Sequence, residues 1–382
     1  MFEAKKYKVL FILPALNVCG GMESFIMNYY RNMDRTKFQF DFLAHSVNDN
    51  SYMGEIKALG DKIYIMPPFG VKTVSKIKSQ YIKILKENKY DIIHCNMANA
   101  AFIYLKYANK CNVPVRILHS HQNKAADSLS HAIRNVPLIA VGKKYANCNV
   151  ACSALAGNFL FKNGDFKIIP NAIDYEKYRY NSKVREEVRT ELRVNDELLI
   201  GHTGRLSNQK NQTFLLNVFH EFVEKNPDTK LLLVGEGENE EQLKNQVVDL
   251  GLKDKVIFTG SRSDIDRLLQ AMDMFVFPSI YEGLGISVLE AQASGLYCIC
   301  SDGVPAEAKI SEEFDRIALD AGMDSWVKKI EEVSHEVIDR ENIKLSPKYD
   351  IKNCSGELEK LYIEEMESVD NGNKGISIRN DG

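Results

Sequence analysis

Asp273-Met-Phe-Val-Phe-Pro-Ser279 is followed directly by Ile-Tyr-Glu-Gly-Leu-Gly285 and then by Ile286-Ser-Val-Leu-Glu-Ala-Gln-Ala-Ser-Gly295. The first segment is a short, β-rich apolar run closed by a proline, which predicts a buried strand. The third predicts a helix that begins near Ile286. Between them, Gly283 and Gly285 let backbone amides approach an anion where unpaired N–H groups and the helix dipole favour phosphate. The stretch therefore predicts a βα unit with an anion-binding loop.

Two carboxylates bracket this loop, Glu282 before it and Glu290 after it. Eight helical positions at about 1.5 Å each would place them roughly 12 Å apart, which suits the two ends of one sugar nucleotide. Carboxylates accept paired hydrogen bonds from sugar hydroxyls, so one glutamate can hold a hexose and the other a ribose. The alternative is an ordinary βα unit with Glu282 in a solvated loop and Glu290 on an exposed helix face.

A basic motif follows an earlier predicted strand, in Gly201-His-Thr-Gly-Arg-Leu-Ser-Asn-Gln-Lys210. The Arg205 guanidinium can bind two phosphate oxygens, and Lys210 adds a mobile point charge. The pair predicts a diphosphate clamp, with two solvated surface cations as the alternative. In Val234-Gly-Glu-Gly237, Gly235 can pack close to a base or phosphates, but the third glycine of a dinucleotide fingerprint is missing.

The first half of the chain carries a second set of candidates. Gly20 and Gly21 precede a predicted helix over residues 22–33, where a turn needs glycine in any case. His94, His119 and His121 lie at the carboxyl ends of two predicted strands, the edge at which open α/β sheets bind ligands. No cluster of Asp and Glu accompanies them in the sequence, so hydrogen-bonded structural histidines or a contact with the donor sugar are favoured over a metal site.

Strands and helices alternate along the chain, which predicts two doubly wound, Rossmann-like parallel sheets facing a cleft. We expect a first domain over residues 1–175 and a second over 176–349. A helix over residues 350–367 should return to the first domain, and the polar residues 368–382 should be disordered. The predicted strands are 8–13, 38–43, 62–66, 92–95 and 115–118, then 198–203, 230–234, 255–258, 274–277 and 297–300.

Composition indicates a soluble protein of 382 residues with 45% hydrophobic content and eight cysteines. The cysteines lack a second ligand pair at zinc spacing, which favours free thiols in a reducing cytosol. Near the N-terminus the longest apolar run, Val9 to Leu16, is too short to span a bilayer and lacks a signal-peptide cleavage site.

Charge is distributed unevenly. Residues 1–180 carry 25 Lys and Arg against 13 Asp and Glu, whereas residues 181–382 carry 24 against 39. Six lysines lie between residues 72 and 89, where apolar residues repeat at helical spacing. This pattern fits either a basic helix on an anionic membrane or a solvated face over a core stripe. No signature of nucleic-acid binding is present.

Together these motifs resemble the retaining GT-B glycosyltransferases of family 4, also called glycosyl transferases group 1, and in particular those of bacterial capsule and exopolysaccharide synthesis. In that family a Glu-Gly-Phe-Gly loop leads into a helix ending Ala-x-Ala-x-Gly; here Leu284 replaces the Phe, and Tyr297 stands where a Pro often follows. The resemblance implies that Arg205 and Lys210 bind the donor diphosphate. It also implies that Gly20-Gly21 is the family's mobile loop and that His121 contacts the transferred sugar, or His119 if the register differs by two.

The resemblance further implies transfer, with retention, of a hexose or N-acetylhexosamine from a nucleotide sugar, with UDP favoured. The acceptor would be a membrane-associated glycan or a polyprenyl-diphosphate-linked sugar at the inner face of the plasma membrane. Catalysis would rest on His121, Glu282, Arg205 and Lys210 without metal or cofactor. The nucleotide sugar would contact Gly20, Gly21, Arg205, Lys210, Gly235, Glu282, Gly283, Leu284, Gly285 and Glu290.

Two other functions stay open. An epimerase on the same scaffold would bind the same nucleotide sugar but would need acid and base carboxylates and no acceptor. A non-catalytic nucleotide-sugar-binding subunit would keep Arg205, Lys210 and Glu290 and lose the contacts of the first domain. An NAD-dependent oxidoreductase is disfavoured because no complete Gly-x-Gly-x-x-Gly follows the first strand.

Overall fold

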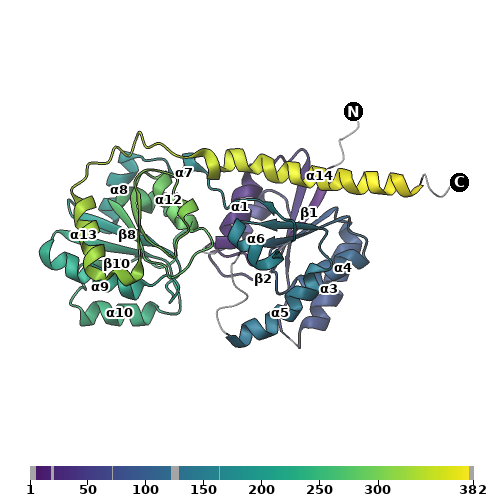
Figure 1. Ribbon diagram of the computed structural model, residues 1–382, viewed down its shortest axis with the longest axis horizontal. Coiled ribbons are helices and arrows are strands. Elements are labelled where there is room, and N and C mark those ends of the chain that lie inside the picture. The colour runs from purple at the N-terminus through teal and green to yellow at the C-terminus, as the bar shows by residue number, and fades with distance from the viewer. Residues whose placement is uncertain (1–5, 19–20, 71, 122–128, 163, 378–382) are drawn as a thin grey trace. The chain divides into compact units, whose positions relative to one another are not determined.

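The computed structural model describes residues 6–18, 21–70, 72–121, 129–162 and 164–377 (Figure 1). The chain divides into two units. Unit 1 combines residues 1–171 with the segment 352–382, and unit 2 comprises residues 172–351. Each unit is built on a parallel sheet with flanking helices, so the prediction of two Rossmann-like α/β domains is confirmed.

The sheet in the described part of unit 1 has seven strands in the order β3-β2-β1-β4-β5-β6-β7. Parallel strands covered on both faces are continuous apolar runs, and in β1 the residues Val9 to Leu13 are at most 1% exposed. The strands are β1 (Tyr7–Ala15), β2 (Phe38–Ser46), β3 (Ile63–Ile65), β4 (Ile92–Cys95), β5 (Val115–Ser120), β6 (Cys148–Ala151) and β7 (Lys167–Ile168).

Helices connect these strands, and three of them, α3, α4 and α5, lie side by side (Figure 1). Apolar residues of α3 and α4, such as Tyr81 and Tyr104, share one core cluster with Leu10 of β1. The helices of unit 1 are α1 (Gly21–Asn32), α2 (Met53–Ala58), α3 (Val74–Asn88), α4 (Ala101–Lys110), α5 (Leu129–Lys143), α6 (Ala154–Phe161) and α14 (Ile351–Ser377).

The sheet of unit 2 has the order β10-β9-β8-β11-β12-β13. Its strands are β8 (Leu198–Thr203), β9 (Thr229–Val234), β10 (Val256–Phe258), β11 (Met274–Phe277), β12 (Tyr297–Ser301) and β13 (Phe314–Ile317). Its α-helices are α7 (Tyr175–Tyr178), α8 (Ser182–Leu192), α9 (Gln212–Lys225), α10 (Glu240–Asp249), α11 (Ile265–Ala271), α12 (Ile286–Ala293) and α13 (Met323–Ser334). The predictions for β4, β8 and β11 match residue for residue, whereas β6, β7 and β13 were not predicted.

The C-terminal helix α14 packs on unit 1 and is longer than expected. Glu359 accepts a hydrogen bond from the Asp34 backbone N–H at 2.6 Å, and Lys167 Nζ lies 2.9 Å from Glu364 Oε2. In the structure the helix continues to Ser377, and the expected disorder of residues 368–382 stays a prediction.

Candidate functional site

The order of the sheet in unit 2 reverses between β8 and β11, and ligands of open α/β sheets bind at the carboxyl ends of strands at such a point. Arg205 follows the end of β8 at Thr203, and Glu282 follows the end of β11 at Phe277. The loops after these strands are joined by the Ile280 N–H, which donates to the Gln209 carbonyl at 2.8 Å. The structure therefore brings the two predicted motifs together.

Lys210 and Glu282 form the central contact of this site. Lys210 Nζ lies 2.7 Å from Glu282 Oε1, and the two side chains are only 17% and 8% exposed. The ammonium also lies 4.6 Å from the ring centroid of Phe277, in a cation–π contact. Water screens a pair at this depth poorly, so the attraction between the ammonium and the carboxylate is stronger than for an exposed ion pair. The sequence predicted both residues but not their pairing.

The loop between Glu282 and α12 differs from the expected geometry. The helix begins at Ile286, as predicted, but Gly285 before it has a left-handed φ of +86°, so Glu282 lies outside the helix. The predicted separation of roughly 12 Å between the two carboxylates assumed eight consecutive helical positions. That assumption is wrong, because the residues from Glu282 to Gly285 form a loop and Gly285 takes a left-handed conformation. The Leu284 side chain is 2% exposed and belongs to the apolar core of unit 2, so any ligand contact of Leu284 uses its backbone.

Glu290 lies on α12 and is oriented by a residue that the sequence did not single out. The Tyr178 hydroxyl donates to Glu290 Oε1 at 2.7 Å. Burial raises the pKa of Glu290 to about 7, although the bond from Tyr178 favours the ionised form. A hydroxyl-rich ligand that donates to this carboxylate would stabilise its charge further.

Arg205 has a looser environment than Lys210. Its side chain is 69% exposed, and Nε lies 3.0 Å from Glu238 Oε2. Exposed ion pairs contribute little, so the guanidinium can turn toward an anion at small cost. Gly235 has a structural reason to be glycine, because a Cβ there would lie 2.1 Å from the Gly204 carbonyl oxygen. Its predicted ligand contact stays a prediction.

Three histidines of unit 1 lie together at the carboxyl ends of β4 and β5; His94 and His119 are buried, and His121 is partly exposed. His94 Nε2 lies 2.9 Å from His119 Nδ1, and the rings of His119 and His121 stack with centroids 4.0 Å apart. Burial lowers the pKa of His94 and of His121 to about 3, which keeps both rings neutral. Asn96 Oδ1 lies 2.8 Å from His121 Nε2, a partner that the sequence analysis missed.

Helix α1 covers these histidines. The Phe25 ring contacts both His119 and His121 edge-on, at 4.9 and 5.0 Å between centroids. Glu23, to which the sequence analysis assigned no role, is 6% exposed, and burial raises its pKa to about 7. Gly21 is the first residue of α1, with open space where a Cβ would lie. Gly20 lies outside the described residues.

Metal-binding groups, cysteines and membrane-spanning helices were also considered in the predictions. Within the described residues, no group of three or more His, Cys, Asp and Glu side chains is arranged to hold a metal ion. The seven cysteines in that part of the chain are free thiols. None of the helices in this part of the chain is long and apolar enough to span a membrane.

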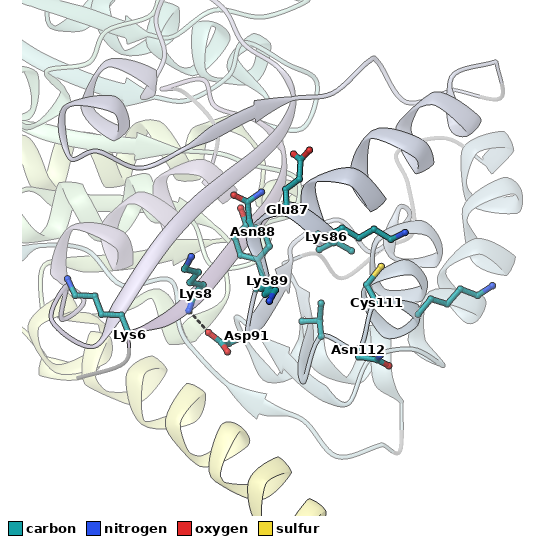
Figure 2. A pocket seen from close by; sticks show the side chains of 13 residues that line it. Lys6, Lys8, Lys86, Glu87, Asn88, Lys89, Asp91, Cys111 and Asn112 are labelled. Carbon is teal, nitrogen blue, oxygen red and sulfur yellow. Dashed lines mark hydrogen bonds between the residues drawn. The ribbon is translucent and has the colours of Figure 1, made fainter. Parts of the chain in front are cut away.

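A hollow of about 870 Å³ lies at the opposite edge of the sheet of unit 1, before the start of β1 and β4. Figure 2 shows side chains that line it. Five lysines line it together with Glu87 and Asp91, namely Lys6, Lys8, Lys86, Lys89 and Lys110. Because the histidines lie at the other ends of these strands, the hollow is not part of the candidate site.

Comparison with known proteins identifies the family. Residues 19–177 match Glycosyltransferase Family 4, and residues 184–346 match glycosyl transferases group 1. The putative glycosyltransferase EpsF of Bacillus subtilis is 31% identical over 339 residues, which cover 86% of this chain and 88% of the relative. This chain is a family 4 glycosyltransferase.

The predicted resemblance is thus confirmed, and the protein is a transferase of glycosyl groups. This glycosyltransferase is 28% identical over 284 residues to UDP-Gal:alpha-D-GlcNAc-diphosphoundecaprenol alpha-1,3-galactosyltransferase of Escherichia coli, covering 70% of this chain and 72% of the relative. Its fold resembles that of Anabaena Alr3699/HepE in complex with UDP-glucose, with a TM-score of 0.70, 17% identity and coverage of 96% and 99% of the two chains. The two units are therefore those of a GT-B glycosyltransferase.

Proposed function

We propose that this glycosyltransferase transfers a hexose or N-acetylhexosamine, with retention, from a UDP-sugar to a lipid-linked acceptor in cell-surface polysaccharide synthesis. The observation that carries the proposal is the buried Lys210–Glu282 pair at the switch point of unit 2. A cation beside a carboxylate suits a ligand with phosphate at one end and sugar hydroxyls at the other. The named substrates of the Escherichia coli relative, UDP-Gal and a diphosphoundecaprenol-linked sugar, support this choice.

In this proposal the bond between the anomeric carbon and the departing diphosphate breaks as the acceptor oxygen attacks from the same face. Negative charge grows on the leaving diphosphate, and Lys210, Arg205 and the amides at the start of α12 stabilise it. The leaving phosphate takes the proton of the acceptor hydroxyl, so no separate base is required. Glu282 and His121 orient the transferred sugar, and Glu290, held by Tyr178, accepts from the ribose hydroxyls. No metal is assigned a role.

A thermal-shift panel of UDP-, GDP-, ADP- and CMP-sugars, each with and without EDTA, tests this function. A ligand that binds only the folded protein raises its stability by mass action, by about 2.7 kcal/mol at a hundredfold excess over Kd. We expect a shift with UDP-sugars that EDTA leaves unchanged. A thermal shift with a different nucleotide sugar would contradict the choice of UDP as the donor nucleotide. Loss of the shift in EDTA would contradict metal independence. Conversion of the sugar without an acceptor would favour the epimerase.

A membrane-facing surface in unit 1 is part of the proposal. Helix α3 buries Ile77, Tyr81, Ile84 and Leu85 and leaves its lysines in solvent. The neighbouring α4 adds Tyr107, whose ring lies 5.2 Å from Lys78 Nζ, and α5 exposes Val136 and Val141 to 56% and 40%. Amines beside exposed apolar side chains suit an anionic bilayer, where each Lys contributes about 1 kcal/mol. The exposed lysines are Lys72, Lys76, Lys78, Lys83, Lys86 and Lys89.

Replacement of four of these lysines by glutamine should weaken binding to anionic liposomes. At about 1 kcal/mol each, the loss of Lys76, Lys78, Lys83 and Lys86 should lower the partition constant in co-sedimentation by roughly 10²- to 10³-fold. The matched control changes Lys183, Lys225, Lys253 and Lys328, all exposed in unit 2, and keeps the same net charge. Equal loss in both variants, or equal binding to neutral lipid, would contradict the surface.

A further inference from the structure

Helix α14 reaches the histidine cluster through one side chain. Tyr362 is 0% exposed, and its hydroxyl lies 2.6 Å from His94 Nδ1. His94 Nε2 in turn lies 2.9 Å from His119 Nδ1. The contacts Tyr362–His94–His119 form an unbroken hydrogen-bonded chain, which we name the relay. It joins residues 268 positions apart in the sequence.

The direction of the hydrogen bonds in the relay follows from counting buried groups. Burial raises the pKa of the Tyr362 phenol and lowers those of both histidines, so all three groups are neutral. If Tyr362 donates to His94 Nδ1, then His94 Nε2–H donates to His119 Nδ1, and only the His119 Nε2–H lacks a partner among the described residues. The reverse direction leaves both the Tyr362 hydrogen and the His119 Nε2 lone pair without partners.

Each unpaired buried polar group costs free energy, so the arrangement with one such group is favoured over the arrangement with two. In this arrangement the tyrosine hydroxyl fixes the tautomer of His94, and His94 fixes that of His119. His119 then keeps a proton on Nε2 while its ring stacks against His121.

The tautomer of His121 is fixed separately, through Asn96. The Asn96 amide nitrogen donates to the carbonyls of Ile12 and His94, both at 3.3 Å, which turns its oxygen toward His121. His121 Nε2–H therefore donates to Asn96 Oδ1, and Nδ1 carries the lone pair. A neutral imidazole in this state accepts a hydrogen from a hydroxyl.

We propose that Tyr362 is a positioning residue for the histidines that contact the transferred sugar. This proposal rests on the proposed function and makes the C-terminal helix part of the sugar site of unit 1. The relay holds His119 against His121, and His121 Nδ1 accepts a hydrogen bond from a sugar hydroxyl. The ligand class is a neutral hydroxylated ring, because neutral histidines offer it a hydrogen-bond acceptor without a charge.

The first test compares Tyr362→Phe with Tyr81→Phe. Tyr81 is the matched control because it is also 0% exposed in unit 1 but its hydroxyl has no hydrogen-bond partner among the residues that the structure describes. We expect Tyr362→Phe to lower kcat about 10- to 100-fold, as for a misplaced catalytic group, with KM for the UDP-sugar changed less than about twofold because nucleotide contacts lie in unit 2. Tyr81→Phe should keep kcat. Wild-type kcat in Tyr362→Phe, or equal losses in both variants, would overturn the proposal.

A second measurement uses the unmodified protein and does not depend on whether a variant folds. Imidazole ¹⁵N shifts should show a proton on Nε2 and none on Nδ1 for His94, His119 and His121 at neutral pH. A proton on Nδ1 of His94 would overturn the relay. Nucleotide-induced thermal shifts separate the two hypotheses: their absence would contradict the proposed function, whereas intact shifts with the wrong tautomers would contradict the relay alone.

Discussion

Lys210→Met is expected to lower kcat by about 10²- to 10³-fold, the loss typical of removing one donor that stabilises a developing negative charge. Methionine keeps much of the length and the apolar stem of lysine, so the variant removes the charge and its cation–π contact with Phe277 at a small change in side-chain volume. In the resting protein Lys210 neutralises Glu282 at 2.7 Å, and we propose that it shifts to the diphosphate as charge develops there. Steady-state kcat and KM with the UDP-sugar chosen by the thermal-shift panel measure the effect.

Two further variants separate charge stabilisation from folding. Lys309→Met removes a lysine whose ion pair with Glu312 is exposed, so kcat should stay within about twofold of wild type. Glu282→Gln should reduce turnover far more than nucleotide affinity, because the carboxylate is assigned to the sugar. If the kcat of Lys210→Met stayed within a few-fold of the wild-type value, the hypothesis that Lys210 clamps the diphosphate would be wrong. Equal losses of turnover and nucleotide affinity in Glu282→Gln would indicate a structural role for that carboxylate.

The strands that position the site could be predicted to the residue. β11 is a continuous apolar run closed by a proline, and β8 begins with the apolar run Leu198 to Ile200 and ends just before the glycine turn at Gly204. The candidate residues Arg205, Lys210 and Glu282 could be predicted because their motifs directly follow these strands. Local sequence was therefore sufficient to predict the candidate residues that lie within a few positions of the end of a strand.

Partners that are distant in the sequence could not be predicted. Lys210 and Glu282 are 72 positions apart, and Tyr178 and Glu290 are 112 apart. Such contacts depend on which strands become neighbours and on how each loop turns, and neither is encoded in a local pattern. Gly285 shows the second limit: its left-handed backbone moves Glu282 off the helix, although the spacing of the glutamates fits a continuous helix.

Arg340 illustrates the same limit for stability. It follows α13 in a segment that looks solvated by composition, yet its guanidinium donates to the carbonyls of Leu269, Gln270, Met272 and Ser294 at 2.7 to 3.2 Å. It also lies 4.3 Å from the ring centroid of Tyr180. Burial lowers the pKa of Arg340 to about 9, so the carbonyl bonds hold a charge that would otherwise be better solvated by water.

Arg340→Met should therefore lower the free energy of unfolding by about 3 kcal/mol, because hydrogen bonds to a charged group are lost and several carbonyls lose their donor. Urea unfolding of the wild type and of Arg340→Met measures this loss of unfolding free energy, and Arg316→Met is the control variant. Arg316 is exposed and donates to one carbonyl, of Asp302 at 2.8 Å, so its replacement should cost less than about 1 kcal/mol. Similar midpoints for the two variants would show that the carbonyls around Arg340 find other donors, and that this segment does not hold α11 and α12 in place.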